Sequence, residues 1–232
     1  MITLLVDPRA LVTGALVEVD REEAHHLKVR RARAPEPIRL IDGQGQVGEG
    51  VLQADGAVLL GRVATVPRPV ALTLAVGAGD RDRFGWLIEK SAELGVTDLV
   101  PLDTERTAGV ASRVRVQHLE RFHRRGVEAI KQCGSAWAPT IHGPVAVEEF
   151  LSRGHLGALW LASSSGAVPG PIPKAGAATI LIGPEGGFTE AEHALAVAAG
   201  FSPVRLGQHI LRFETAALAA AAHVQLLREA SP

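Results

Sequence analysis

The pattern of apolar and polar residues divides the chain into two unlike parts. Up to residue 66, short apolar runs are separated by glycine-containing turns, a pattern typical of a small β-rich module. The turns at 43–45 (Gly-Gln-Gly) and 55–56 (Asp-Gly) predict hairpins. Asp20, with Glu23 three places on, predicts the start of one helix, which runs to about Arg30. The expected strands are 3–6, 15–19, 37–41, 46–52 and 57–66.

From residue 70 onwards, apolar runs alternate with helical patterns, which is typical of a parallel sheet covered by helices on both faces. The stretch 67–69 (Pro-Arg-Pro) is stiff, so we expect a first domain at 1–66 and a second at 70–232. Residues 163–176 are rich in Ser, Gly and Pro and are expected to form a loop. The expected strands are 70–76, 96–102, 157–162, 177–182 and 204–206. The expected helices are 83–94, 114–133, 147–153, 189–200 and a last one from about residue 215.

Composition narrows the possible functions. The formal net charge of −1 gives no global field that attracts nucleic acid, so any RNA contact must come from local patches. Cys133 is the only cysteine, which excludes a disulfide within the chain, and the nine histidines lack metal-ligand spacing, so we expect no metal site. The N-terminus lacks a signal-peptide pattern and no apolar run approaches ~18 residues. We therefore expect a cytoplasmic protein with no membrane span.

Two glycine-broken strand–loop–helix units lie in the last quarter of the chain. Residues 181–192 read LIGPEGGFTEAE: a buried strand stops at Gly183, two further glycines follow, and Thr189 begins a capping box that starts a helix. Residues 206–216 read LGQHILRFETA and repeat the plan. Glycine lets backbone N–H and C=O groups approach a ligand, and loops at the carboxyl ends of parallel strands form the usual ligand crevice. We therefore expect one pocket built from both loops.

Three ionisable residues accompany these loops in apolar or small-residue surroundings: Glu185, Arg212 and Glu214. Perturbed charged groups gather at functional sites, although structural ion pairs perturb them too. Arg212 could simply pair with Glu214, and the dipole of the following helix could explain Glu214 on its own. The sequence leaves the structural and the functional interpretation open.

Other glycine and serine motifs offer alternatives. Residues 74–80 (LAVGAGD) resemble the first motif of Rossmann-type methyltransferases but lack its third glycine. If that segment held the cofactor, damage at Gly79 would abolish cofactor binding and damage at Gly186 would not. The chain has neither a P-loop nor a G-x-S-x-G elbow, and we interpret Ser163–Gly166 as loop rather than as a nucleophile site.

Motifs along almost the whole chain resemble a single family. The runs 181–192 and 206–217 resemble the two C-terminal signatures of the RsmE family, the 16S ribosomal RNA uridine-N3 methyltransferases of the SPOUT superfamily. Further matches, in chain order, are HLKVRR at 26–31, KSAELGV at 90–96, ER at 105–106 and QCG at 132–134.

The resemblance implies an α/β protein with an N-terminal PUA-like β-barrel that binds RNA and a SPOUT methyltransferase domain with a C-terminal trefoil knot. It implies S-adenosylmethionine as methyl donor, 16S ribosomal RNA of the small ribosomal subunit as substrate, and a homodimer. For the dimer, the alanine-rich helix at 215–229 is a candidate interface, and a buried core helix explains its alanines equally well. The cofactor-binding residues then expected are Leu181, Gly183, Pro184, Glu185, Gly186, Gly187, Leu206, Gly207, Ile210, Leu211 and Thr215.

Transfer of a methyl group to N3 of uridine requires that nitrogen to lose its proton. We expect Glu214 to take the proton and Arg212 to stabilise the charge left on the carbonyl oxygens. For RNA we expect backbone contacts from the cations that end the first helix, although a helix C-terminus favours cations in any protein. The RNA-binding residues expected are Lys28, Arg30, Arg31, Arg33 and Arg106.

The chain departs from the family pattern in the second loop and after QCG. It has Gln208-His209 where the family usually has Pro-Arg, Phe213 where it has Thr, and Ser135 where it has Arg. These departures keep open an alternative function, that of a non-catalytic RNA-binding or ribosome-assembly protein with the same fold. A calorimetric titration with S-adenosylmethionine separates the two, because a mere RNA binder need not hold the cofactor.

Overall fold

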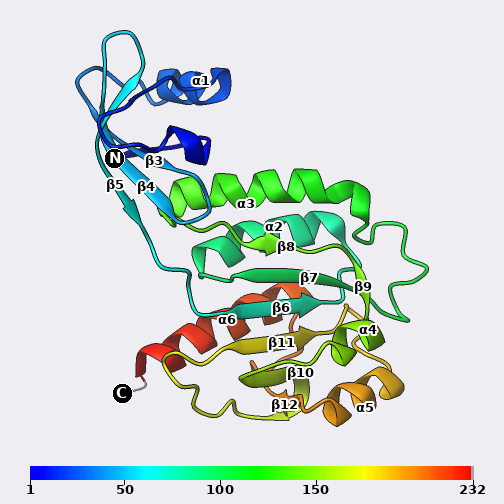
Figure 1. Cartoon of the computed structure of the whole chain (residues 1–232). Coiled ribbons are helices and arrows are strands. Elements are labelled where there is room, and N and C mark those ends of the chain that lie inside the picture. The colour runs from blue at the N-terminus through cyan, green and yellow to red at the C-terminus, as the bar shows by residue number, and fades with distance from the viewer. Residues whose placement is uncertain (231–232) are drawn as a thin grey trace. The chain divides into compact units, whose positions relative to one another are not determined.

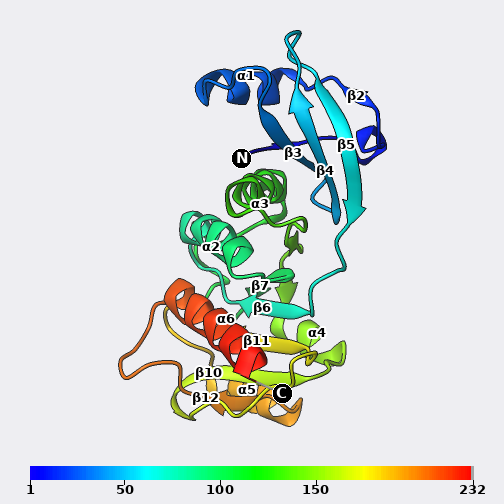
Figure 2. The ribbon, with the colours of Figure 1, turned by 90° about the vertical axis from the view of Figure 1, so that its left-hand side faces the viewer.

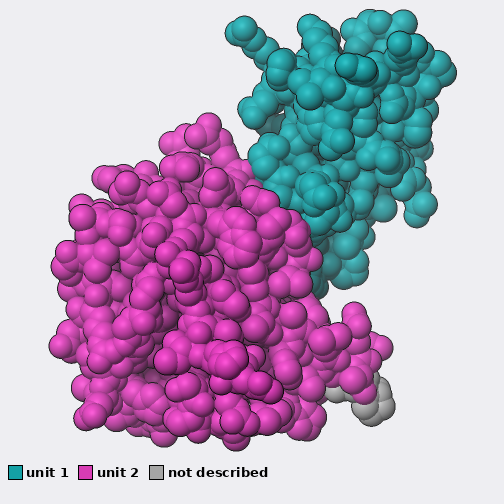
Figure 3. Space-filling model, turned by 180° about the vertical axis from the view of Figure 1, so that it is seen from behind, with its two compact units in different colours: residues 1–69, 127–138 teal, residues 70–126, 139–232 magenta. Residues whose placement is uncertain are grey.

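The structure is a computed structural model that describes residues 1–230. The chain forms two compact units, drawn in two colours in Figure 3: unit 1 comprises residues 1–69 and 127–138, and unit 2 comprises 70–126 and the residues from 139 onwards. The boundary between residues 69 and 70 comes directly after the Pro-Arg-Pro stretch. Residues 127–138, expected in the second domain, belong to unit 1.

Unit 1 is built on a five-stranded sheet. Its strands are β1 (Ile2–Leu5), β2 (Leu16–Val17), β3 (Pro37–Ile41), β4 (Gln46–Leu52) and β5 (Val58–Thr65). Their order is β1-β3-β4-β5-β2, and β1 is parallel to β3 while the other neighbours are antiparallel. The two predicted hairpin turns connect β3 to β4 and β4 to β5. Leu4, Ile38 and Leu60 lie in a core cluster that the sheet shares with the helix of this unit.

That helix, α1 (Arg21–Val29), starts as the sequence predicts. The Asp20 carboxylate accepts a hydrogen bond from the Glu23 backbone N–H at 2.8 Å and so satisfies one of the free donors of the first turn. Leu27 points into the unit's core, and Arg31 adopts a positive φ of 55° just beyond the helix end.

Residues 127–138 join unit 1 through the β3–β4 turn. They include the end of α3 (Leu119–Cys133) and the segment after it. The Gly45 N–H donates to the Ala136 carbonyl at 2.9 Å, and the Trp137 indole N–H donates to the Val66 carbonyl at 3.0 Å. The Trp137 ring lies so close to Gly45 that a Cβ there would overlap it. Ser135, one of the departures from the family pattern, bonds both to the N–H and to the carbonyl of Trp137.

Unit 2 contains a seven-stranded sheet in which the strand pairings within the described residues are all parallel. Its strands are β6 (Leu72–Val76), β7 (Asp98–Asp103), β8 (Thr140–Ile141), β9 (Val145–Ala146), β10 (Ala158–Ala167), β11 (Ala178–Ile182) and β12 (Ser202–Val204). They run in the order β12-β10-β11-β6-β7-β8, and β9 also pairs with β7. The helices of this unit are α2 (Arg81–Glu93), the first part of α3, α4 (Val147–Ser152), α5 (Glu190–Ala198) and α6 (Phe213–Ala230).

Helices cover both faces of this sheet, as a parallel sheet requires. In β6, Leu74 and Val76 belong to a core cluster with α2 and α6, which lie side by side in Figure 2. Ala75, between them in sequence, belongs to a second cluster with α4 and α5 on the other face. The continuous apolar runs of the sequence therefore correspond to strands buried on both sides, and the predicted α/β fold class is confirmed.

Some predicted elements need correction. Residues 163–167, expected to be loop, continue β10, because Ala167 pairs with Val204 of β12 and Gly166 lets the two backbones approach closely. The strand expected at 204–206 is β12, which ends at Val204, and α3 begins at Leu119 rather than at residue 114. Four alanines of α6 (Ala216, Ala217, Ala220 and Ala221) pack in the core of their own chain, so their small size has an explanation without a dimer. Across residues 1–230, no helix is long and apolar enough to cross a membrane.

Candidate functional site

The two glycine-broken loops of the sequence line one cavity in unit 2. They follow β11 and β12, whose carboxyl ends lie at the same edge of the parallel sheet (Figure 1). The cavity measures about 330 Å³, within the range of small-molecule sites. The predicted cofactor-binding residues among its lining are Gly183, Pro184, Glu185, Gly186, Gly187, Leu206, Gly207, Ile210 and Leu211.

Two predicted cofactor contacts lie elsewhere. Leu181 is fully buried in β11, in the cluster with α4 and α5, so its side chain points away from the cavity. Thr215 is exposed in the first turn of α6 and is not part of the cavity lining. Ile210 is the opposite case, since it lines the cavity and is 89% exposed.

The first loop needs glycine at two points for different reasons. Gly187 has a φ of +74°, which side-chain-bearing residues rarely adopt. A Cβ on Gly183 would lie 2.9 Å from the Phe188 backbone nitrogen, so only glycine lets the chain turn this tightly. The turn ends at the predicted capping box, in which the buried Glu192 accepts a hydrogen bond from the Thr189 N–H at 2.8 Å. The other oxygen of Glu192 accepts from the Glu105 N–H at 2.9 Å and so ties the loop to the segment after β7.

Two arginines lie against this loop. A Cβ on Gly186 would be 3.0 Å from Cδ of Arg106, so the arginine stem, predicted to contact RNA, lies directly over the glycine pair. Arg83 of α2 approaches the Glu185 carboxylate at 3.4 Å, and both side chains are partly exposed. Exposed pairs of this kind contribute little stability, so the Arg83 contact chiefly orients Glu185 at the rim of the cavity.

The segment that resembles a Rossmann motif supports the first loop. The Gly77 N–H donates to the Ile182 carbonyl at 2.8 Å, and a Cβ on Gly77 would lie 2.7 Å from the Pro184 nitrogen. Asp80 caps α2 by accepting from two backbone N–H groups of its first turn. The two glycines and the aspartate therefore have packing and capping roles, and none of them lines the cavity.

The two predicted catalytic residues flank Phe213, which is buried and lines the cavity. Glu214 is buried in the first turn of α6, and its Oε2 has no hydrogen-bond partner. Arg212 is exposed, and no ion pair joins it to Glu214 in the part of the chain that the structure describes. The structural ion pair between Arg212 and Glu214, one of the two interpretations left open by the sequence, is therefore not formed. Neither side chain is part of the cavity lining.

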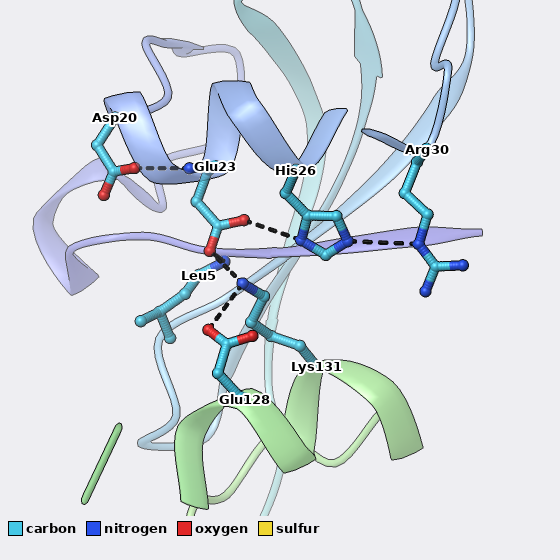
Figure 4. A network of polar contacts seen from close by, with 7 residues as sticks. All are labelled: Leu5, Asp20, Glu23, His26, Arg30, Glu128 and Lys131. Carbon is cyan, nitrogen blue, oxygen red and sulfur yellow. Dashed lines mark hydrogen bonds and ion pairs between the residues drawn. The ribbon is translucent and has the colours of Figure 1, made fainter. Parts of the chain in front are cut away.

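The predicted RNA-binding cations of unit 1 lie at the end of α1 and are all exposed. Below them is a buried network, shown in Figure 4. The Lys131 ammonium donates to Glu23 Oε1 at 2.6 Å and to Glu128 at 3.0 Å, and the Leu5 N–H donates to the same Glu23 oxygen at 3.3 Å. Burial disfavours the charge on Lys131, but the hydrogen bonds to the two carboxylates outweigh it and raise its pKa.

The network continues towards the surface of α1. His26 Nδ1 lies 3.5 Å from Glu23 Oε2, and the Arg30 Nε–H donates to His26 Nε2 at 3.4 Å (Figure 4). The buried pair therefore anchors the helix that carries the predicted RNA-binding cations.

Several residues that the fold brings together were not predicted from the sequence. Ser163 and Ser164 line the cavity from β10, although their segment was expected to be loop, and Arg205 lines it from just beyond β12. Lys131 pairs with Glu23 across 108 positions of sequence. One lining residue could have been found from the sequence: His209 departs from the family pattern, and it lines the cavity. No group of His, Cys, Asp or Glu among residues 1–230 is placed to hold a metal ion.

Comparison with known proteins assigns the class. A sequence model of the RNA methyltransferase domain matches residues 66–225, which covers most of unit 2. A ribosomal RNA small subunit methyltransferase E from Synechocystis is 34% identical over 97% of this chain and 78% of its own length. The corresponding protein of Mycobacterium bovis is 30% identical over 93% of this chain and 88% of its own length.

Solved structures agree over the whole chain. A ribosomal RNA small subunit methyltransferase E from Neisseria gonorrhoeae bound to S-adenosyl methionine superposes with a TM-score of 0.86 at 31% identity, over 98% of both chains. A putative methyltransferase from Legionella pneumophila, also with that cofactor, gives 0.81 at 26% identity over 97% of both. The chain belongs to the ribosomal RNA small subunit methyltransferase E family. The resemblance seen in the sequence is confirmed, and the Rossmann-type alternative has no support.

Proposed function

We propose that the protein transfers a methyl group from S-adenosylmethionine to N3 of a specific uridine in 16S ribosomal RNA of the small ribosomal subunit. The observation that carries this proposal is that both signature loops line the same cavity, in a chain that belongs to a methyltransferase family. The Neisseria relative with 31% identity is described as bound to the same cofactor.

The cavity suits a flat aromatic base joined to a charged tail. Backbone groups of 183–187 and 206–211 would recognise the adenine edge, and Leu206, Ile210 and Leu211 would cover its faces. Ile210 lines the cavity and is 89% exposed, so an adenine packed on it would remove its apolar surface from water. The cofactor supplies the methyl group, and the protein aligns donor and acceptor and excludes water.

Glu214 is our candidate for the base that takes the N3 proton, and Arg212 for the group that stabilises the resulting charge. A buried carboxylate oxygen without a partner is uncommon in folded proteins, and Glu214 follows directly on Phe213, which lines the cavity; a substrate N–H that reached this oxygen would complete it. Arg212 is exposed and lies in the chain between two residues that line the cavity, Leu211 and Phe213; from there it would reach a carbonyl oxygen of a bound base.

A matched pair of variants tests this assignment. Glu214→Gln keeps the shape but cannot accept the proton, so kcat should fall ~100-fold or more with little change in cofactor affinity. Glu190→Gln is the control, because Glu190 also lies in the first turn of a helix but is exposed. Unchanged kcat in Glu214→Gln would contradict the assignment.

The remaining parts of the proposal rest on the family resemblance. Unit 1 would act as the PUA-like RNA-binding module, with Lys28, Arg30, Arg31 and Arg33 on RNA phosphates. The protein would act as a homodimer in the cytoplasm, where its ribosomal substrate is found, and its C-terminal part would form the trefoil knot. Sedimentation analysis of the purified protein tests the dimer.

Mass spectrometry of ribosomal RNA from cells with and without the protein tests the function as a whole. We expect one methylated uridine to disappear from small-subunit RNA when the gene is removed and to return with the wild-type chain. An unchanged modification pattern, together with no cofactor binding by calorimetry, would instead favour the non-catalytic RNA-binding protein.

A further inference from the structure

A second concentration of positive charge lies in unit 2, outside the cations already considered in unit 1. Residues 106–125 contain six arginines and one acidic residue, Glu120, which gives a formal charge of +5 in a chain whose total is −1. A local excess of this size is the electrostatic signature of a phosphate-binding surface. The six arginines are Arg106, Arg113, Arg115, Arg121, Arg124 and Arg125.

The fold brings the middle and the last part of this segment to the start of α2. The rings of Phe84, in the first turn of α2, and Phe122, in the first turn of α3, pack with centroids 5.3 Å apart. Figure 1 shows the two helices next to each other. The Arg81 N–H donates to the Ser112 carbonyl at 2.8 Å, so the loop between β7 and α3 is tied to the same place. The Arg115 N–H donates to Nδ1 of His118 at 3.0 Å and fixes the approach to α3.

These cations are poorly neutralised by the protein itself. Arg115 and Arg124 are exposed, and within residues 1–230 neither takes part in an ion pair. Arg121 reaches Asp82 only at 3.9 Å, with both side chains well exposed. The surrounding charge also acts on His118, whose pKa is lowered first by burial and then by Arg81, Arg115 and Arg121.

One arginine of this segment lies at the rim of the cavity. The segment's first member, Arg106, lies over Gly186 in the loop that we assign to the cofactor. The segment from Arg106 to Arg115 then covers the loop before α2, through the contact of Ser112 Oγ with the Gly79 carbonyl at 2.9 Å. The arginine segment therefore begins at the loop assigned to the cofactor and leads away from it towards the start of α2.

We propose that Arg106, Arg115, Arg121 and Arg124 form a surface of unit 2 that binds the phosphate backbone of the RNA beside the target base. The proposal rests on the proposed function and deepens it, because it gives the methyltransferase unit an RNA contact of its own. Arginine suits this role, since its planar guanidinium pairs with two phosphate oxygens at once. Such contacts add affinity and register without reading sequence.

The test is the salt dependence of RNA binding by the full chain carrying Arg115→Gln and Arg124→Gln. Removing one arginine–phosphate pair from a complex with single-stranded RNA lowers the slope of log Kd against log salt by ~0.7, so the double variant should show a slope smaller by ~1.4. Between 50 and 200 mM salt the affinity of the wild type should therefore fall about sevenfold more than that of the variant. The probes are an oligouridine strand and isolated small ribosomal subunits.

Three controls make the result decisive. Arg153→Gln with Lys174→Gln removes the same net charge from exposed positions elsewhere in unit 2 and should leave the slope unchanged. Arg115→Lys with Arg124→Lys should restore most of it. Calorimetry with S-adenosylmethionine should give wild-type affinity in every variant. If the wild type itself binds no cofactor, the proposed function fails. The comparison of salt slopes would still show whether these arginines bind RNA.

Two outcomes would overturn the inference. One is an equal fall in slope for both double variants, which would mean that only the general field matters. The other is an unchanged slope accompanied by a changed oligomeric state in sedimentation, which would mean that these arginines contact a second copy of the chain instead of RNA.

Discussion

The buried pair of Glu23 and Lys131 gives the strongest prediction for stability. Lys131→Met keeps the length and apolar stem of the side chain and removes its charge. The Glu23 and Lys131 side chains are only 5% and 4% exposed, so Glu23 would remain buried without its cation. Its Oε2 has no hydrogen-bond partner and only the His26 ring at 3.5 Å, and its Oε1 would keep only the 3.3 Å contact from Leu5. Removing one partner of such a pair costs ~3–5 kcal/mol of unfolding free energy.

Urea unfolding monitored by hydrogen exchange measures this cost and locates it within the chain. We expect the midpoint to fall and the amides of residues 1–69 and 127–138 to lose protection, while those of 70–126 keep it, because the pair lies within unit 1. RNA affinity should fall as well, since the pair anchors α1 beneath the predicted RNA-binding cations.

Two further variants separate the buried pair from a general charge effect. Lys90→Met is the matched control: Lys90 also contacts two carboxylates, at 2.9 and 2.8 Å, but on the surface, so its loss should change stability little. Glu23→Leu combined with Lys131→Met removes both buried charges and should recover most of the loss. A cost below ~1 kcal/mol for Lys131→Met, or no recovery in the double variant, would refute the reasoning.

Three other predictions concern unit 2. Arg228 is buried and donates hydrogen bonds to the carbonyls of Gly176, Ala71 and Val70. Arg228→Met leaves these carbonyls without their donor and should lower the unfolding free energy, measured in urea, by ~3 kcal/mol. A loss below ~1 kcal/mol would contradict this. The pKa of His118 is lowered on folding, so the folded chain binds the imidazole proton less tightly than the unfolded chain does. The stability that the neutral ring provides is therefore lost as pH falls below ~6.5. His118→Gln should flatten this pH dependence of the unfolding free energy, and an unchanged pH profile would show that His118 does not cause it. Gly183→Ala should abolish cofactor binding in calorimetry because its Cβ meets backbone, whereas Gly186→Ala meets only the flexible Arg106 and should retain it; equal losses would disprove this distinction.

Local sequence determined the elements and the place of the candidate site. Alternation of apolar runs with helical patterns predicted the parallel sheet, and the capping residues Asp20 and Thr189 marked helix starts that the structure confirms. The two glycine-broken loops were predicted to meet because parallel strands deliver their carboxyl ends to one edge, and both line the same cavity. These features depend on neighbours within a few residues or on the periodicity of one element, which a sequence records directly.

Only the tertiary structure decided which distant residues meet. No residue near Lys131 in the sequence predicts its contact with Glu23. The composition of residues 163–167 predicts a loop, and only their pairing with β12 makes them part of a strand. The same holds for Arg106 over Gly186 and for the unpartnered oxygen of Glu214, which the sequence left as half of a possible ion pair. The physical reason is that burial and partner choice depend on the register between elements, and this register is set by the packing of the whole unit rather than by any local pattern.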